Sequence, residues 1–426
     1  MMTITSDGEE PVQVSPPSDT WCINAEYSLS VGTDGGCMAC CMADGGVLDE
    51  KGHHMNVAVH SIEEIHASPH LMRVRENLQN GIKDPMCKKC WHEEAAGRDS
   101  KRLRDNKDVK FSTPPVQGDL KILELNLGNT CNIKCRTCSP NSSSQWVREW
   151  FDLVAKKDHP TLQWDDYRKQ KTQYTILYDS DSSFWESVHR VAPSVEILDF
   201  YGGEPFLIKK QWEFIKHCVE QDIAKNKSLH YNTNCTTWPT EHIQYLPKFK
   251  QLNMGLSIDG VGEHDHFIRF PTVWADVDEN VDRWYQYGMA NENSNISVCM
   301  TLSPMNILYI PEMMEYVDQK NEKFGSNKLS LYLNLIHQPA HYNISNMPDY
   351  FKKAVTEKLQ PHIGRNNYLE GILQFMNNGV YNKTHWKVFR QKIRDNDEYR
   401  GQNFATTFPE VHEILGRNTD AIYVDI

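Results

Sequence analysis

The stretch Lys121-Ile-Leu-Glu-Leu-Asn-Leu127, followed shortly by Cys131-Asn-Ile-Lys-Cys135-Arg-Thr-Cys138, decides the fold and the chemistry of this chain. The first part is a short apolar run typical of a buried β-strand. The cysteines that follow have the spacing C-x3-C-x2-C. Three thiolates can hold three irons of a cubane iron–sulfur cluster and leave the fourth iron without a protein ligand. Catalytic metal sites generally keep such an open position, so the triplet predicts a reactive cluster.

The composition sets limits on the class of protein. A length of 426 residues indicates two to three domains, or one large α/β barrel with appendages. The formal charge of −12 argues against a nucleic-acid partner, because phosphate binding needs clustered Lys and Arg. The sequence has no apolar stretch long enough to predict a membrane span. Residues 1–20 are polar and lack the apolar core of a signal peptide, so we expect a disordered tail there.

The twelve cysteines point to metal or redox chemistry. Without an export signal they are not expected to form disulfides, and we expect a cytoplasmic protein. Cys218, Cys235 and Cys299 are isolated, and we interpret them as small buried hydrophobic residues. The other nine fall into the triplet and a group within the first hundred residues.

Strand-like and helix-like segments alternate after the triplet, which is typical of βαβ units around a parallel sheet. We therefore predict an α/β fold, a partial (β/α)6 TIM-like barrel over 118–345. A helical extension is expected over 346–426. Polar signatures follow several predicted strands, where parallel α/β folds gather their functional groups. Six strands are expected, within 121–127, 195–201, 229–233, 252–258, 296–302 and 328–335.

This pattern resembles the radical S-adenosylmethionine (SAM) superfamily over residues 118–342. The resemblance rests on the cysteine triplet, on Gly202-Gly203-Glu204-Pro205, and on Ser257-Ile-Asp-Gly260 with Arg269 nine residues on. It implies that Cys131, Cys135 and Cys138 ligate a [4Fe–4S] cluster whose open iron takes the amino and carboxylate groups of SAM. It also implies reductive cleavage of SAM to a 5′-deoxyadenosyl radical that abstracts hydrogen from a substrate.

The resemblance extends to the residues that bind SAM. Gly202, Gly203 and Glu204 are similar to the segment that binds its amino group; glycine allows close approach of the backbone, and a carboxylate can accept from an ammonium. Ser257 and Arg269 are similar to the contacts of the carboxylate and the ribose, where the planar guanidinium suits a carboxylate. The remaining implied contacts are Asn232 and Asn234 at the ribose or methionine moiety and Leu335 at the adenine.

Residues 21–117 resemble the auxiliary iron–sulfur modules called SPASM and twitch, which usually follow a radical SAM barrel and here precede it. Twelve residues separate Cys22 from Gly35, four more lead to Cys40, and Cys87-Lys-Lys-Cys90 comes later. Gly35-Gly36 predicts a hairpin turn. The resemblance implies a second [4Fe–4S] cluster held by Cys22, Cys40, Cys87 and Cys90. Cys41 could replace Cys40, and Cys37 could be a bystander or a reserve ligand. The alternative is a structural zinc site, since four thiolates also bind zinc.

The predicted function is that of a radical SAM enzyme, an oxidoreductase or a transferase. Members of the family with such modules often modify peptides or proteins, so a peptide is the expected substrate. The implied partners are SAM and an electron donor such as flavodoxin or ferredoxin, with neither nucleic acid nor membrane. Two alternatives stay open: a radical SAM enzyme that acts on a small molecule, and a noncatalytic iron–sulfur electron-transfer or scaffold protein.

Overall fold

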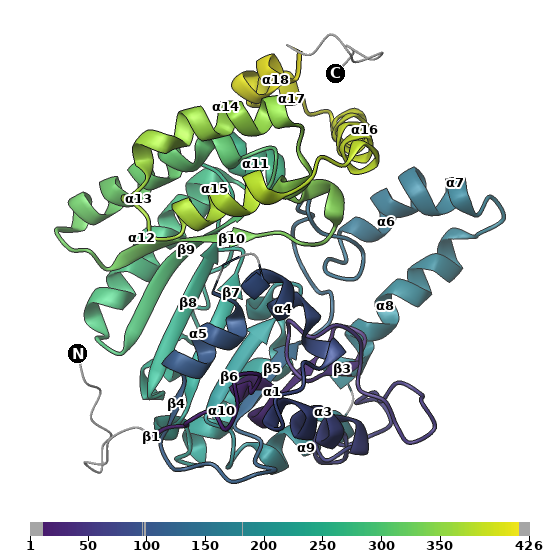
Figure 1. Cartoon of the computed structure of the whole chain (residues 1–426), viewed down its shortest axis with the longest axis vertical. Helices are drawn as coiled ribbons and strands as arrows, with labels where there is room; N and C mark the ends of the chain where they lie inside the picture. Colours follow the sequence, from purple (N-terminus) through teal and green to yellow (C-terminus); the bar gives the residue numbers. More distant parts are fainter. Residues whose placement is uncertain (1–11, 96, 98, 181, 417–426) are drawn as a thin grey trace. The chain divides into compact units, whose positions relative to one another are not determined.

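The computed structural model describes residues 12–95, 97, 99–180 and 182–416 and divides the chain into two compact units. Unit 1 contains residues 1–131, 169–231 and 239–253, and unit 2 contains 132–168, 232–238 and 254–426. Both are mixtures of helices and parallel strands (Figure 1). The predicted α/β class with an ordered series of parallel strands is confirmed.

All six predicted strands are present, and two further strands, β2 and β3, join them. In unit 1 the order is β7-β6-β5-β2-β3, with β7, β6, β5 and β2 parallel and β3 antiparallel to β2. In unit 2, β9 and β10 are parallel neighbours. The bounds are β2 (Ser28–Val31), β3 (Cys37–Met38), β5 (Ile122–Asn126), β6 (Ile197–Tyr201), β7 (Ser228–Thr233), β8 (Gln251–Ser257), β9 (Ser294–Leu302) and β10 (Leu329–Leu335).

The turn between β2 and β3 follows from its glycines. The Gly32 amide donates to the Gly36 carbonyl at 2.7 Å, and Gly35 has a φ of 79°, which side chains with a Cβ rarely adopt. The hairpin predicted at Gly35-Gly36 is therefore confirmed.

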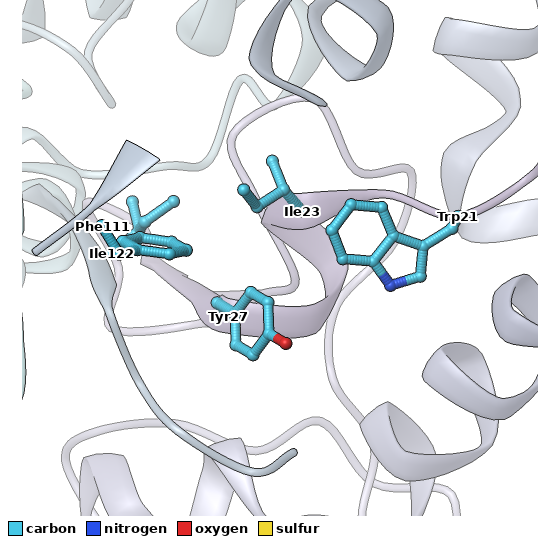
Figure 2. Packing of buried hydrophobic residues seen from close by; sticks show 5 residues of the cluster. All are labelled: Trp21, Ile23, Tyr27, Phe111 and Ile122. Carbon is cyan, nitrogen blue, oxygen red and sulfur yellow. The ribbon is translucent and has the colours of Figure 1, made fainter. Parts of the chain in front are cut away.

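A small aromatic core fixes the start of the chain in unit 1. Trp21, Ile23, Tyr27, Phe111 and Ile122 pack together, and the Tyr27 ring meets the Phe111 ring edge-on with centroids 5.7 Å apart (Figure 2). Edge-to-face contacts of this kind stabilise a core beyond the area that they bury. The strand β1 (Val12–Gln13) pairs with β4 (Lys110–Phe111) beside this core.

The N-terminal segment differs in part from the predicted tail. Residues 1–11 lie outside the described residues. Residues 12–20 take part in the fold, because Val12 and Gln13 pair with β4 and the Thr20 hydroxyl donates to the Leu78 carbonyl at 2.7 Å. The polar composition of 1–20 concealed this, since the pairing partner lies about a hundred residues away.

Several helices of unit 1 begin at clear capping residues. Ser61 and Glu64 form a capping box at α2, and Ser68 caps α3, which has Pro69 in its first turn. The helix predicted over 209–225 ends at Glu220, because Asp222 adopts a left-handed φ of 55°. The bounds are α1 (Ile23–Tyr27), α2 (Ile62–His66), α3 (Pro69–Gln79), α4 (Lys88–Ala95), α5 (Lys101–Asp108), α9 (Ser182–Val191) and α10 (Lys209–Glu220).

Unit 2 holds the remaining helices. The three helices predicted beyond residue 346 are present as α14 (Asp349–Leu359), α15 (Leu369–Asn378) and α16 (Lys383–Arg400), and α17 (Phe404–Thr407) and α18 (Pro409–Gly416) follow them. No helix was predicted between the triplet and β6. The structure has α9 of unit 1 there, and before it α6 (Trp146–Trp150), a π-helical turn (Phe151–Ala155), α7 (Lys156–Asp158) and α8 (Trp164–Ser180), which ends in unit 1. The others are α11 (Glu263–Ile268), α12 (Trp274–Ala290) and α13 (Ile310–Phe324).

None of the helices in the described part of the chain combines the length and the apolar character needed to cross a bilayer.

Candidate functional site

The loop after β5 and the loop after β6 meet in unit 1, at the carboxyl ends of two neighbouring strands. The amide of Glu204 donates to the carbonyl of Thr130 at 2.7 Å, and Thr130 directly precedes Cys131. Parallel pairing of β5 with β6 brings these loops to the same edge of the sheet. The glycine-rich segment is therefore held by its backbone against the first cysteine of the triplet.

Glycine is required at this contact. Gly202 and Gly203 have φ values of 80° and 48°. A Cβ on Gly203 would overlap the Thr130 carbonyl group, lying 2.8 Å from its carbon atom. The side chain of Glu204 is fully buried and accepts a hydrogen bond from the amide of Phe206 at 3.2 Å. From the sequence, the two glycines were expected to let the backbone approach a ligand closely. The structure shows that the backbone also approaches Thr130 closely.

In unit 2, Cys135 lies beside Cys138 and Arg269. A guanidinium nitrogen of Arg269 is 3.8 Å from Cys135 Sγ, and the Cys138 amide donates to the Cys135 carbonyl at 3.0 Å. The thiol of Cys138 and the charge of Arg269 lower the pKa of Cys135 despite its burial. A lowered pKa favours the thiolate, which is the form that binds metal.

Two buried carboxylates hold Arg269 in place. Its Nε lies 2.8 Å from Asp259 Oδ2, a charge contact without hydrogen-bond alignment. The other oxygen of Asp259 accepts from the Thr301 amide at 2.8 Å, and Asp265 accepts from the Asp259 amide. Burial raises the pKa of Asp265 to about 6, against the opposing effect of Arg269. Asp259 lay inside the predicted motif, but its role as the partner of Arg269 was not predicted.

The other predicted SAM contacts lie at the carboxyl ends of their strands. Asn234, just past β7, donates to the side chain of Asn132 at 2.9 Å, and Asn132 directly follows Cys131. Asn232 and Ser257 are half-buried at the ends of β7 and β8, and Leu335 is the last residue of β10. Each of these residues lies at or just past the carboxyl end of its strand, and their roles toward SAM stay predictions.

The four cysteines predicted for the auxiliary cluster line one small cavity in unit 1. Cys22, Cys40, Cys87 and Cys90 surround a space of about 10 Å³, the size of one water molecule. Burial raises the pKa of Cys22 to about 12 and also raises the pKa of the other three thiols. Such thiols are protonated at neutral pH unless a metal or cluster replaces the proton. A convergent set of four soft ligands fits an iron–sulfur cluster.

The positions of Cys41 and Cys37 in unit 1 bear on which cysteines could ligate the auxiliary cluster. Cys41 lies away from that cavity, and its amide donates to Glu124 Oε2 at 2.5 Å. Cys37 is buried in β3, with its thiol 3.6 Å from the carbonyl of Gly35. The geometry therefore favours Cys40 over Cys41. Within the residues that the structure describes, no three Cys, His, Asp or Glu side chains are grouped closely enough to hold a single metal ion.

Cys218 and Cys235 are buried, as expected for structural residues, and Cys299 is half-buried beside Ser297.

Comparisons with known families match two parts of the chain. Residues 125–317 match the sequence profile of the radical SAM superfamily, and residues 22–91 match that of the iron–sulfur cluster-binding domain called SPASM. The second match includes the four cysteines around the cavity. No curated protein sequence matches the chain.

Several solved structures are distantly similar. Native anSMEcpe with bound AdoMet and Cp18Cys peptide is 17% identical, with a TM-score of 0.31 and coverage of 60% of each chain. A hexahistidine-tagged anSMEcpe with bound AdoMet is 17% identical, with a TM-score of 0.28 and coverage of 46% of this chain and 50% of the other. Streptococcus suis SuiB bound to the precursor peptide SuiA is 11% identical, with a TM-score of 0.30 and coverage of 90% and 75%. This chain thus spans only half to three fifths of those anSMEcpe chains.

Proposed function

We propose that this chain, in which residues 125–317 match the radical SAM superfamily and residues 22–91 match the SPASM domain, is a radical SAM enzyme that abstracts hydrogen from a peptide or protein substrate. The radical SAM domain binds a [4Fe–4S] cluster with SAM, and the SPASM domain binds additional iron–sulfur clusters. We assign Cys131, Cys135 and Cys138 to the first cluster. When bound, that cluster supplies the electron that cleaves SAM to methionine and a 5′-deoxyadenosyl radical.

One observation carries this proposal: the backbone of Gly203 and Glu204 lies directly against Thr130, the residue before Cys131. A purely structural cluster or an electron carrier has no use for a second, glycine-rich loop pressed against its ligand loop. Arg269 beside Cys135 adds a cation where a thiolate and the SAM carboxylate both need one. Residues 21–117, 118–345 and 346–426 are the proposed cluster domain, catalytic domain and helical extension.

The first test measures SAM cleavage. Full-length protein is reconstituted anaerobically with iron and sulfide, reduced with dithionite and mixed with SAM. We expect 5′-deoxyadenosine from the wild type and none from Cys135→Ala, because that change removes one of three cluster ligands. Cys218→Ala, in α10, is the matched control and should cleave SAM as the wild type does. Wild-type protein with an intact cluster and no 5′-deoxyadenosine would refute the catalytic proposal.

The second test concerns the auxiliary site, which we propose holds a [4Fe–4S] cluster ligated by Cys22, Cys40, Cys87 and Cys90. Two cubanes require about eight irons per chain. The double variant Cys87→Ala/Cys90→Ala should retain about four irons, whereas Cys41→Ala should retain all of them, since Cys41 does not line the cavity formed by the four cysteines. About four irons and one zinc in the wild type would support the structural zinc site instead. Elemental analysis of protein reconstituted in parallel decides between the outcomes.

We further propose that a small electron-transfer protein such as flavodoxin or ferredoxin delivers the electron in the cell. The redox chemistry requires a one-electron donor, and dithionite replaces it in the assays above.

A further inference from the structure

A cavity of about 360 Å³ lies within unit 2, beside the loop that carries the third cysteine of the triplet. Its lining combines residues from that loop, from α6 and from α16, among them Cys138, Ser139, Trp146, Trp150, Lys392 and Asn396. Sites that bind small ligands commonly have this size and combine aromatic walls with a few polar groups. The cavity can therefore admit one residue of a larger substrate.

The cavity adjoins the triplet but does not include the residues predicted to contact SAM. Cys138 is the only lining residue that is also assigned to a cluster, and none of the predicted SAM contacts belongs to the lining. The indole of Trp146 donates to the Cys135 carbonyl at 2.7 Å, which ties one wall of the cavity to the cluster loop. A group bound here would thus lie beside the proposed reactive cluster and leave the predicted SAM contacts free.

The charged side chains that line the cavity are cationic. They are Arg136 and Lys392, and the lining includes neither aspartate nor glutamate. Burial lowers the pKa of His341, another lining residue, to about 4, so its imidazole is neutral at pH 7. Arg136 is compensated by an ion pair with Asp397. Lys392 has neither an ion pair nor a hydrogen bond among the described residues, and its ammonium lies 4.7 Å from the centre of the Trp150 ring.

The buried carboxylate of Glu149, next to α16, is already occupied by other groups. It lies 2.7 Å from Lys134 Nζ and accepts from Arg400 Nε at 2.9 Å. It also accepts from Asn396 Nδ2 at 2.8 Å. Two cations and an amide therefore share this carboxylate, and it forms no ion pair with Lys392.

The half-buried ammonium of Lys392 is incompletely compensated. Burial lowers its pKa, and the charges of Asp395 and Glu149 oppose this only in part. The face of the Trp150 ring attracts a cation less strongly than a hydrogen-bonded carboxylate does. An anion that enters the cavity would thus favour the charged form of Lys392 and would itself be stabilised.

A second polar group without a partner lies one helical turn from Lys392. Asn396 lines the cavity and is 1% exposed, and the two residues share a face of α16. The bond from its Nδ2 to Glu149 fixes the orientation of the amide. Its Oδ1 has no hydrogen-bond partner among the described residues. A buried acceptor in this state at a cavity wall indicates a place for a donor from a ligand or from water.

We propose that this cavity binds a carboxylate group of the substrate, with the Lys392 ammonium facing it and the rings of Trp146 and Trp150 packed against neighbouring apolar groups. The carboxylate belongs either to an acidic side chain or to the C-terminus of a peptide. An amide N–H beside it would satisfy Asn396 Oδ1. The inference rests on the proposed function for the peptide nature of the substrate, and it adds the charge of the group that is recognised.

The test uses reconstituted, unreduced full-length protein and three small probes, measured by anaerobic calorimetry. N-acetyl-leucine carries a C-terminal carboxylate, N-acetyl-glutamate methylamide carries a side-chain carboxylate, and N-acetyl-leucine methylamide is neutral. We expect at least one carboxylate probe to bind at least tenfold more tightly than the neutral probe. The tighter of the two carboxylate probes identifies the source of the carboxylate.

Lys392→Met retains the length of the side chain and removes its charge. We expect this variant to bind the tighter carboxylate probe at least tenfold more weakly than the wild type does. Lys387→Met is the matched control, because Lys387 is an exposed lysine of the same helix that does not line the cavity. It should bind every probe as the wild type does.

Equal binding of the three probes, or full affinity of Lys392→Met for the carboxylate probe, would overturn the inference. Displacement of that probe by saturating SAM would also overturn it, because the cavity would then be part of the SAM site. If Lys392→Met does not fold, as judged by circular dichroism, the probe comparison and the SAM competition on the wild type still decide. Failure of the proposed function is detected separately, by the SAM-cleavage assay. A protein that forms 5′-deoxyadenosine and shows no preference for a carboxylate refutes only this site.

Discussion

Replacing Gly203 by alanine is expected to lower SAM cleavage at least about 100-fold while the cysteine-bound iron is retained. The new Cβ would lie 2.8 Å from the Thr130 carbonyl carbon, and the contact is with backbone, which cannot rotate away. Relieving it must move the glycine-rich loop off the loop that ends in Cys131. A loss of about 2.7 kcal/mol in binding or transition-state stabilisation corresponds to that factor, and overpacking of a tight contact typically costs about 1–3 kcal/mol or more.

The matched control is Gly325→Ala. Gly325 ends α13 with a φ of 65°, so it has the same left-handed backbone, but an added Cβ would meet nothing within 4 Å. Both variants carry the cost of a non-glycine residue in that conformation, about 1–2 kcal/mol. Only Gly203→Ala adds the overlap. The readouts are 5′-deoxyadenosine formation, SAM affinity and iron content; equal SAM cleavage by the two variants would show that the Thr130 contact does not position the SAM segment.

The strands and the residues at their ends could be predicted from the sequence because each is marked by residues that lie close together in the chain. Each strand is a short apolar run, and Cys131, Gly202 and Ser257 come within a few residues of a strand end. Parallel strands gather their carboxyl ends at one edge, so a local pattern was enough to collect these residues. The choice between Cys40 and Cys41 as a ligand could not be made from neighbouring residues in the sequence. Adjacent side chains point in different directions, and only the backbone path decides which one meets Cys22.

Other features depend on pairing between distant segments. The strand β2 lies directly beside β5, although Ser30 and Glu124 are 94 positions apart, and nothing near Ser30 specifies that partner. The alignment of Glu124, Asp199 and His230 across β5, β6 and β7 has the same origin. A glutamate, an aspartate and a histidine at the third position of three strands look unrelated until the register aligns them. The early part of the chain was expected to supply cysteine ligands. The same segment also places Lys101 3.6 Å from Glu124, and no local pattern showed this.

Lys101→Met is expected to lower the free energy of unfolding by about 3 kcal/mol. Breaking a buried ion pair by removing one partner typically costs about 3–5 kcal/mol, because the remaining charge stays buried without compensation. We expect a cost at the lower end of this range, since 22% of the Lys101 side chain is exposed. Glu124 is the residue most affected, because it is fully buried and Lys101 is its nearby cation. The exposed variant Lys210→Met is the matched control, and we expect it to change stability by less than about 0.5 kcal/mol.

Two further measurements identify Glu124 as the cause. Adding Glu124→Gln to Lys101→Met should recover about half of the lost free energy of unfolding. The glutamine side chain keeps an acceptor for the Cys41 amide and carries no charge.

The loss of unfolding free energy in Lys101→Met should also shrink as the pH falls. Burial already raises the pKa of Glu124, and removing Lys101 raises it further. The folded variant then takes up a proton at a pH where the unfolded chain does not, which stabilises the fold. Urea unfolding at pH 8 and pH 6, with equal cofactor content, should show the smaller deficit at pH 6; a deficit independent of both pH and Glu124→Gln would place its origin in lost packing of the lysine stem.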